Sequence, residues 1–274
     1  MEKPKPTYSY DVLVGEWYER KVDEEQKLAM YLKKKERGQL LITRLRRLFA
    51  NMLKEVQLSL PTKGLTYGGI IQVLAPDVIS TPPTVTNSKK KGLVLAVTIQ
   101  STDIDTKQDF EDQFLLIGSP ETRPCARNSF YIVPEDEQKV NQPVCYGDVF
   151  YLRCAANTEV PLYVEAPLLS PSIEVGKSGY PVPRLALYKG SDTRFRVTHL
   201  NEDLRMESIG APVAPFQKVL IVHAPVNVPL CVENDYWHNS LFSPECEISI
   251  RSTRNYKKEY DIRNQWVFTV GALV

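Results

Sequence analysis

Hydrophobic residues follow two different periods along the chain, and the change of period divides it into two parts. Between residues 23 and 57, apolar residues recur at steps of three and four, which is the spacing of amphipathic helices. Beyond residue 61, short runs of alternating or apolar residues are separated by proline, glycine and asparagine, as in strands joined by turns. The pattern predicts a mainly β protein with an N-terminal α-helical appendage.

Two helices are predicted in the appendage. The first runs over residues 24–37, because Asp23 and Gln26 resemble a capping box and Gly38 supplies a stop after a basic last turn. Ahead of it, residues 1–22 are expected to form an extended N-terminal arm with an apolar, aromatic segment. The second helix runs from about residue 39 to residue 56 and carries one apolar stripe, formed by Leu41, Leu45, Leu48, Phe49, Met52, Leu53 and Val56.

The β part contains an internal repeat. Residues 160–165 and 228–233 read Val-Pro-Leu-x-Val-Glu, differ only at Tyr163 and Cys231, and each follow an apolar strand. The ends of three copies also match, because residues 127–130, 192–195 and 263–266 each lead into another strand. An aromatic residue opens each copy, at Tyr67, Tyr146 and Phe216. This similarity predicts three copies of one β unit.

Four strands can be assigned to each copy. In the third copy they are Val219–His223 and residues 230–232, 247–251 and 266–270. Three units of four strands predict a closed all-β body, specifically a β-trefoil-like domain with loop insertions at residues 81–91 and 101–124. The expected organisation is an arm at 1–22, a basic helical pair at 23–60 and the trefoil-like domain at 61–274, with units at about 66–140, 145–205 and 212–272.

Charge and cysteine content narrow the class of protein. The formal net charge is +1, so a polyanionic partner would have to be met by a local patch. Five cysteines without a C-x-x-C pair favour reduced, buried thiols, and three scattered histidines do not have the spacing of metal ligands. The first residues lack the apolar core of a signal peptide, and no run of 18 apolar residues predicts a membrane span.

Basic residues gather on the two predicted helices. Residues 33–47 contain seven Lys and Arg residues against one Glu, which predicts a docking patch for an acidic protein or nucleic acid. A solvated helix face with ordinary dipole complementation is the alternative. Because aromatic residues are not interleaved with the cations, an acidic protein is favoured over nucleic acid. The candidate partner-binding residues are Trp17 of the arm and Lys33, Lys34, Lys35, Arg37, Arg44, Arg46 and Arg47.

No catalytic constellation can be identified in the sequence. It contains neither a nucleophile elbow nor a phosphate-binding loop, and Gly68-Gly69 precedes a strand rather than a helix. The adjacent carboxylates at 111–112 and 135–137 lie in predicted loops without a base or metal ligand nearby. We therefore expect no enzymatic activity, no cofactor and no metal site.

Several segments, in collinear order, resemble the cilia- and flagella-associated protein 161 family. They are residues 14–17, 35–47, 56–59 and 67–68 near the N-terminus, then 127–132, 146–148, 218–223 and 264–267. The resemblance extends over about residues 12–270 and implies a MIR-type trefoil and a non-enzymatic role. It further implies a microtubule inner protein in the A-tubule lumen of axonemal doublets, bound to α/β-tubulin and other inner proteins, with no nucleic-acid or membrane partner.

The resemblance favours a structural function in motile cilia or flagella. A rigid trefoil would pack on the luminal tubulin wall, while the helices and the arm would reach neighbouring proteins. The alternative is a cytosolic β-trefoil module that binds carbohydrate or nucleic acid. It predicts exposed aromatic and carboxylate side chains at equivalent positions of the three copies, where this sequence has strand residues such as 160–165 and 228–233.

Overall fold

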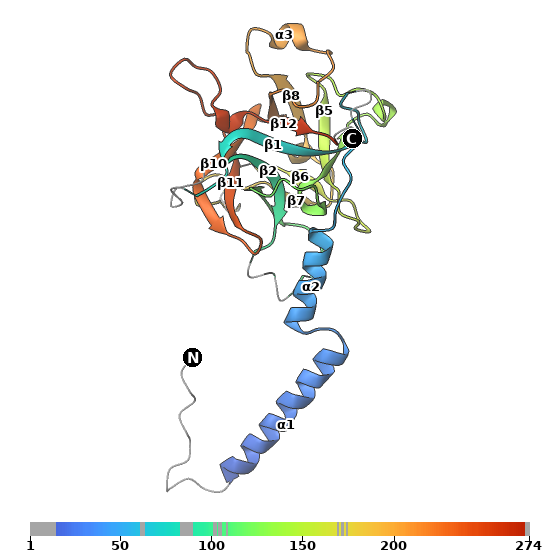
Figure 1. Cartoon of the computed structure of the whole chain (residues 1–274), viewed down its shortest axis with the longest axis vertical. Helices are drawn as coiled ribbons and strands as arrows, with labels where there is room; N and C mark the ends of the chain where they lie inside the picture. The colour runs from blue at the N-terminus through green and yellow to red at the C-terminus, as the bar shows by residue number, and fades with distance from the viewer. Residues whose placement is uncertain are drawn as a thin grey trace. The chain divides into compact units, whose positions relative to one another are not determined.

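The chain has a helical N-terminal part followed by a part built from β strands. The computed structural model describes residues 15–60, 64–82, 90–100, 103, 106–107, 109–168, 170, 173 and 175–271, and it divides the chain into two compact units, Met1–Arg47 and Leu48–Val274. Two helices, α1 (Gly15–Glu36) and α2 (Leu41–Met52), precede the β strands (Figure 1). The structure thus confirms a mainly β protein with an N-terminal helical part.

Helix α1 corrects the predicted extended arm. It begins at Gly15, so residues 15–22 are helical, whereas residues 1–14 lie outside the described part of the chain. Asp23 is therefore an interior residue, and its carboxylate pairs with Lys27 one turn later at 2.5 Å instead of capping the helix. The predicted stop at Gly38 is confirmed: its φ of +64° suits glycine, and Gln39 N–H donates to the Lys34 carbonyl at 2.8 Å.

Helix α2 is shorter than predicted and ends at Met52. Leu48 and Met52 belong to the second unit and are buried in its core. The chain then leaves the helix because its backbone pairs with another segment: Ala126 N–H donates to the Lys54 carbonyl at 2.9 Å, and Glu55 forms a bridge with Cys125. Val56, predicted as the last residue of the stripe, packs against the core from this extended segment.

The described residues of the second unit, Leu48–Val274, form twelve strands, and this whole unit is called the β unit. The first predicted range holds β1 (Ile70–Ile79), β2 (Lys91–Thr98), β3 (Leu115–Ser119) and β4 (Phe130–Pro134). The second holds β5 (Val149–Cys154), β6 (Tyr163–Glu165), β7 (Arg184–Ala186) and β8 (Phe195–His199). The third holds β9 (Val219–His223), β10 (Val228–Asn239), β11 (Pro244–Ile250) and β12 (Val267–Thr269). A one-turn helix, α3 (Arg205–Ser208), follows β8.

Strand pairing repeats with the same logic in the three ranges. The two middle strands form antiparallel pairs, β2–β3, β6–β7 and β10–β11, the last of which is the long hairpin in Figure 1. The outer strands pair as β1–β4 and β5–β8, and the copies join through β4–β5, β8–β9 and β12–β1. Between β9 and β12, however, only the isolated bridge of Val219 with Trp266 is formed, so the strand ladders do not close into a barrel.

The matching copy ends have a structural counterpart. A 3-10 helix precedes the last strand of each copy: η1 (Ala126–Asn128), η3 (Ser191–Thr193) and η4 (Ile262–Asn264). Its last residue is buried and holds nearby backbone with its side chain. Asn128 Oδ1 accepts from Cys125 N–H at 2.8 Å, and Thr193 Oγ1 accepts from Gly190 N–H at 2.9 Å. The remaining 3-10 helix, η2 (Glu137–Lys139), follows the last strand of the first copy.

The aromatic residues that open the copies are not all equivalent. Tyr67 and Tyr146 are buried, and each precedes a glycine with positive φ. Phe216 is 58% exposed and itself has a φ of +60°, and its N–H donates to the fourth strand of its copy at Phe268, as Gly68 does at Ile132. Phe216 therefore stands at the glycine position of this turn, one residue later than the sequence pattern indicated.

We predict that Asn264→Ala lowers the free energy of unfolding of the β unit by about 2–3 kcal/mol, because buried polar groups would lose their partners. Asn264 is fully buried, and its Nδ2 donates to the carbonyls of Leu230 at 3.0 Å and Arg251 at 2.7 Å, while Oδ1 accepts from Thr253 N–H at 2.9 Å. Urea denaturation followed by tryptophan fluorescence, to which the fully buried Trp266 contributes, measures the loss. Asn264→Asp keeps the shape but removes both donors; a neutral effect of this variant would contradict the prediction.

Candidate interaction sites

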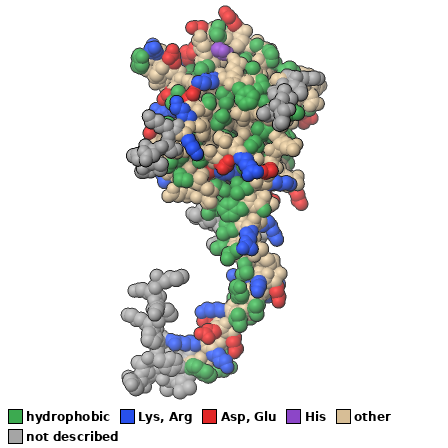
Figure 2. Space-filling view, viewed as in Figure 1, with side chains coloured by type: hydrophobic (Ala, Val, Ile, Leu, Met, Phe, Trp, Pro, Cys, Tyr) green, Lys and Arg blue, Asp and Glu red, His purple; other side chains and the backbone are tan. Residues whose placement is uncertain are grey.

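The predicted basic residues all lie on or between α1 and α2, in the first unit. Lys33, Lys34 and Lys35 form the last turn of α1 and are exposed, and Arg37 follows the helix end. On α2, Arg46 and Arg47 are exposed and Arg44 is half-buried. Along the helices, Lys and Arg side chains are interspersed with acidic and apolar ones (Figure 2). On the face that Figure 2 shows, the cations are therefore part of a mixed surface.

Helix α1 also exposes apolar side chains besides the candidate Trp17. Trp17, the aromatic candidate, is 57% exposed, and its ring lies 5.7 Å from Lys21 Nζ. Leu28 and Leu32 follow it at 11 and 15 residues, which places the three side chains on one side of a 3.6-residue helix. The large exposed apolar residues of the helices are Trp17, Tyr18, Leu28, Met30, Tyr31, Leu32, Leu41 and Ile42.

The second unit contains three buried carboxylates on the hairpin β10–β11. Glu245 is fully buried and pairs with Arg127, which is 1% exposed. Arg127 also donates to Ser119 Oγ at 2.7 Å and to the Val97 carbonyl at 3.1 Å. Its guanidinium lies 4.0 Å from the ring centre of Phe242. The arginine is therefore held by charge, hydrogen bonds and a cation–π contact at once.

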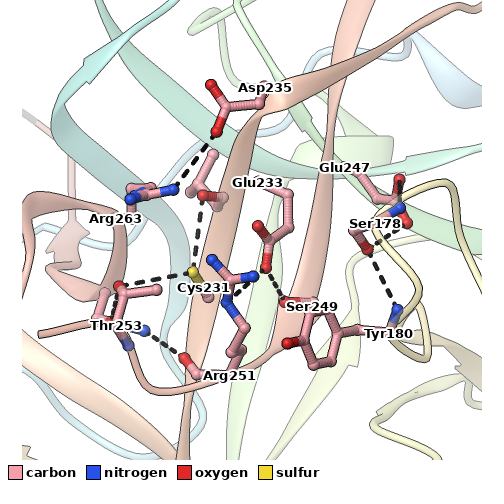
Figure 3. A network of polar contacts seen from close by, with 12 residues as sticks. Ser178, Tyr180, Cys231, Glu233, Asp235, Glu247, Ser249, Arg251, Thr253 and Arg263 are labelled. Carbon is pink, nitrogen blue, oxygen red and sulfur yellow. Dashed lines mark hydrogen bonds and ion pairs between the residues drawn. The ribbon is translucent and has the colours of Figure 1, made fainter.

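Glu233 is the second of these carboxylates (Figure 3). Its Oε1 accepts a hydrogen bond from Ser249 Oγ at 2.6 Å and lies 3.4 Å from Arg251 Nε. Arg251 in turn lies 5.0 Å from the ring of Tyr180. Like Glu245, this buried acid has a guanidinium as its counter-ion.

Glu247 is the third, and its surroundings differ. Its carboxylate accepts hydrogen bonds from Ser178 Oγ at 3.0 Å and Ser178 N–H at 3.3 Å, and from His238 Nε2 at 3.3 Å. Figure 3 shows Ser178 on the loop beside the Glu247 strand. A Cβ at Gly176 would lie 1.3 Å from Glu247 Oε1, so only glycine leaves room for the acid there.

Two cavities in the described part of the second unit have walls built from distant segments. One, of about 460 Å³, adjoins Glu247 and His238 and is otherwise lined by β2, β3 and the loops at 175–182 and 239–241. The other, of about 690 Å³, is a largely apolar groove between the segment 56–60, β1 and the end of β12, and the Nε2 of buried Gln72 has no hydrogen-bond partner there. Sequence reasoning identified neither cavity, because their walls come from distant parts of the chain.

The cysteines are not suited to nucleophilic chemistry. All five are free, and only Cys145 is partly exposed. Burial raises the pKa of the Cys154 and Cys231 thiols to about 12, so both are protonated at neutral pH. Within the described residues, no cluster of three or more His, Cys, Asp and Glu side chains could hold a metal ion. None of the described helices is long and apolar enough to cross a membrane.

Comparison with known structures relates the fold to a solved protein. An SDF2-like protein from Arabidopsis thaliana superposes with a TM-score of 0.50 over 77% of this chain and 97% of its own, at 15% sequence identity. At this identity the similarity concerns the fold alone.

Comparison of sequences gives a closer relation. Cilia- and flagella-associated protein 161 of Mus musculus is 28% identical over 96% of this chain and 88% of its own length. The Bos taurus protein is 25% identical over 97% and 83%, and the Danio rerio protein 24% identical over 97% and 88%. A family model, the cilia- and flagella-associated protein 161-like domain, matches residues 44–170 and 175–271, which is most of α2 and of the β unit. The predicted resemblance is therefore confirmed, and the chain belongs to the cilia- and flagella-associated protein 161-like family.

Proposed function

We propose that this chain is a non-enzymatic structural protein of motile cilia and flagella that binds the luminal wall of the A-tubule in doublet microtubules. Family membership makes it a cilia- and flagella-associated protein. That membership, extending from α2 to the end of the β unit, is the observation that carries the proposal. Within the doublet, α/β-tubulin and neighbouring inner proteins would be its partners.

We further propose that the β unit is a β-trefoil of the MIR type. The repeated pairing supports this: each copy has a middle hairpin, and the outer strands follow one another around β1, β4, β5, β8, β9 and β12. Two backbone hydrogen bonds, of 2.8 and 3.0 Å, also link Val219 of β9 to Trp266 next to β12, at this one isolated bridge. Such a preformed body loses little conformational entropy on binding, which suits a permanent structural site.

The helices provide the contact surface in this proposal. Exposed Lys33, Lys34 and Lys35 would meet an acidic surface, and the apolar side of α1 would add buried area. Each exposed ion pair contributes only about 0.2–1 kcal/mol. In a regular array, however, several linked contacts per molecule act together, and the avidity exceeds that of any single contact.

Cryo-electron microscopy of native doublets tests the location. Doublets from cilia that contain the chain should show its density at a regular axial repeat inside the A-tubule, and doublets from cells that lack it should lose that density. Returning the chain should restore it. Density on the outer tubule surface, or release of the chain from intact axonemes in moderate salt, would contradict a luminal position.

Charge reversal tests the contact surface. We predict that the triple variant Lys33→Glu, Lys34→Glu, Lys35→Glu binds doublets about tenfold more weakly, because lost ion pairs and new repulsions together cost about 1.4 kcal/mol. The matched control reverses three exposed lysines of the second unit, Lys54, Lys257 and Lys258, and changes the net charge equally. Co-sedimentation with salt-stripped doublets measures both. Equal weakening by the two triples would mean that net charge, not this site, sets the affinity.

A further inference from the structure

The three buried carboxylates of the β10–β11 hairpin are not equally compensated. Glu245 has Arg127 and Glu233 has Arg251 as counter-ions. Glu247 is 1% exposed, and among the described residues its only ionisable partner within 4.0 Å is His238. A buried carboxylate is costly unless it is paired and fully hydrogen-bonded. No guanidinium or ammonium group of the described chain thus lies within 4.0 Å of the Glu247 carboxylate.

The cavity beside Glu247 has room for the missing cation. It measures about 460 Å³, and its apolar wall includes Leu115, Ile117 and Val182. The same cavity is lined by Thr98, which is 6% exposed and whose Oγ1 has no hydrogen-bond partner. A carboxylate without a cation requires a hydrogen-bond donor, and an unpaired buried hydroxyl in the same cavity can accept from that donor. The apolar wall can pack against an aliphatic chain that carries this donor at its end.

The free acceptor positions of Glu247 distinguish an ammonium from a guanidinium. Oε2 already accepts from Ser178 N–H and His238, whereas Oε1 accepts only from Ser178 Oγ. Since each carboxylate oxygen accepts about two hydrogen bonds, one position remains, on Oε1. A guanidinium binds best when it can reach both oxygens at once. An ammonium is a point donor and needs only one.

We propose that this cavity binds a lysine side chain presented by a partner protein. The aliphatic stem lies against the apolar wall, Nζ pairs with Glu247 Oε1, and the Thr98 hydroxyl is available as a second acceptor. Gly176 belongs to the site because a side chain there would displace the carboxylate. Lys177 also lines the cavity; it is exposed, and its Nζ lies 3.5 Å from the Trp237 carbonyl, so it opposes a cation electrostatically from the rim. This site is independent of the proposed location in the doublet.

Titration of the full chain with three capped amino acids tests the proposal. The probes are the N-acetyl, N′-methylamide derivatives of lysine, arginine and norleucine, followed by ¹⁵N–¹H NMR spectra. The lysine probe should bind saturably with a Kd of about 1–10 mM, since one charge-assisted contact and a short stem give only a few kcal/mol. Arginine should bind at least about fivefold more weakly, and norleucine, which lacks the charge, more weakly still.

Variants of the chain show whether the lysine probe binds in this cavity. Glu247→Gln should weaken the lysine probe at least about tenfold, whereas Glu165→Gln, which alters a carboxylate paired with Arg184 outside the cavity, should leave it unchanged. Lys177→Gln should strengthen binding about twofold, because a like charge leaves the rim. This exposed variant keeps the test decisive if Glu247→Gln fails to fold. Equal binding of lysine and norleucine, no saturable lysine binding, or weaker binding by Lys177→Gln would each overturn the proposal.

Discussion

Replacing Arg127 by methionine is expected to lower the free energy of unfolding of the β unit by about 3–5 kcal/mol, the cost of breaking a buried ion pair from one side. Arg127 and Glu245 are 1% and 0% exposed, so neither charge can be compensated by water. Without the guanidinium, Glu245 stays buried without a counter-ion, and Ser119 Oγ and the Val97 carbonyl lose their donor. Chemical denaturation monitored by tryptophan fluorescence, to which the buried Trp266 contributes, measures the loss.

The double variant Arg127→Met, Glu245→Leu identifies the cause. If the penalty comes from an unpaired buried acid, removing the acid as well should return stability to within about 1–2 kcal/mol of the original. Arg123→Met is the matched control, because Arg123 pairs with Glu55 at 73% and 68% exposure, and its loss should cost no more than about 1 kcal/mol. Equal destabilisation by the single and double variants would show that packing around Phe242, not charge, dominates.

The repeat in the sequence predicted where strands lie better than how far they extend. Residues 160–165 and 228–233 are nearly identical, yet β6 covers only Tyr163–Glu165 while β10 runs from Val228 to Asn239. The difference comes from the partner strand: β10 pairs with β11 at seven positions, and β6 with β7 at three. Local sequence sets the tendency to form a strand, but tertiary pairing sets its length.

Local sequence also cannot distinguish the surroundings of equivalent positions in different copies. Arg127 and Arg263 both precede an asparagine at the end of a 3-10 helix, and the sequence gives no reason to separate them. Arg127 is buried against Glu245, whereas Arg263 is 26% exposed and pairs with Asp261 at 3.0 Å. The difference depends on a residue 118 positions away, which no local pattern contains.

The lysine-binding cavity could not have been predicted for the same reason. Glu247 fits the alternating pattern of a strand, which marks it as polar but does not show that its side chain is buried. Ser178, its main hydrogen-bond donor, lies 69 residues earlier in a loop without a distinctive pattern. That the basic candidate residues lie on or beside helices could be predicted, because runs of cations and the helical period are local features, whereas their role in binding stays a prediction.

Phe150→Ala is expected to lower the free energy of unfolding by about 3–5 kcal/mol, the usual cost of emptying a buried phenylalanine site. The Phe150 ring is fully buried, 6.4 Å from Phe268 in an edge-to-face arrangement and 6.5 Å from Phe195. These rings come from β5, β12 and β8, so one cavity would loosen contacts within the second copy and between the second and third. For a domain with about 5–15 kcal/mol of stability, the loss is a large fraction.

Two further variants separate the effect of the cavity from the effect of losing aromatic contacts. Phe150→Leu keeps most of the apolar volume and should cost about 1–2 kcal/mol, so the difference from alanine reports the cavity rather than the loss of aromatic contacts. Phe216→Ala is the control, because its ring is 58% exposed and should change stability by no more than about 0.5 kcal/mol. Since Phe150 joins strands of two copies, a cost below about 1 kcal/mol would mean that the copies are held together by backbone ladders, with no common aromatic core.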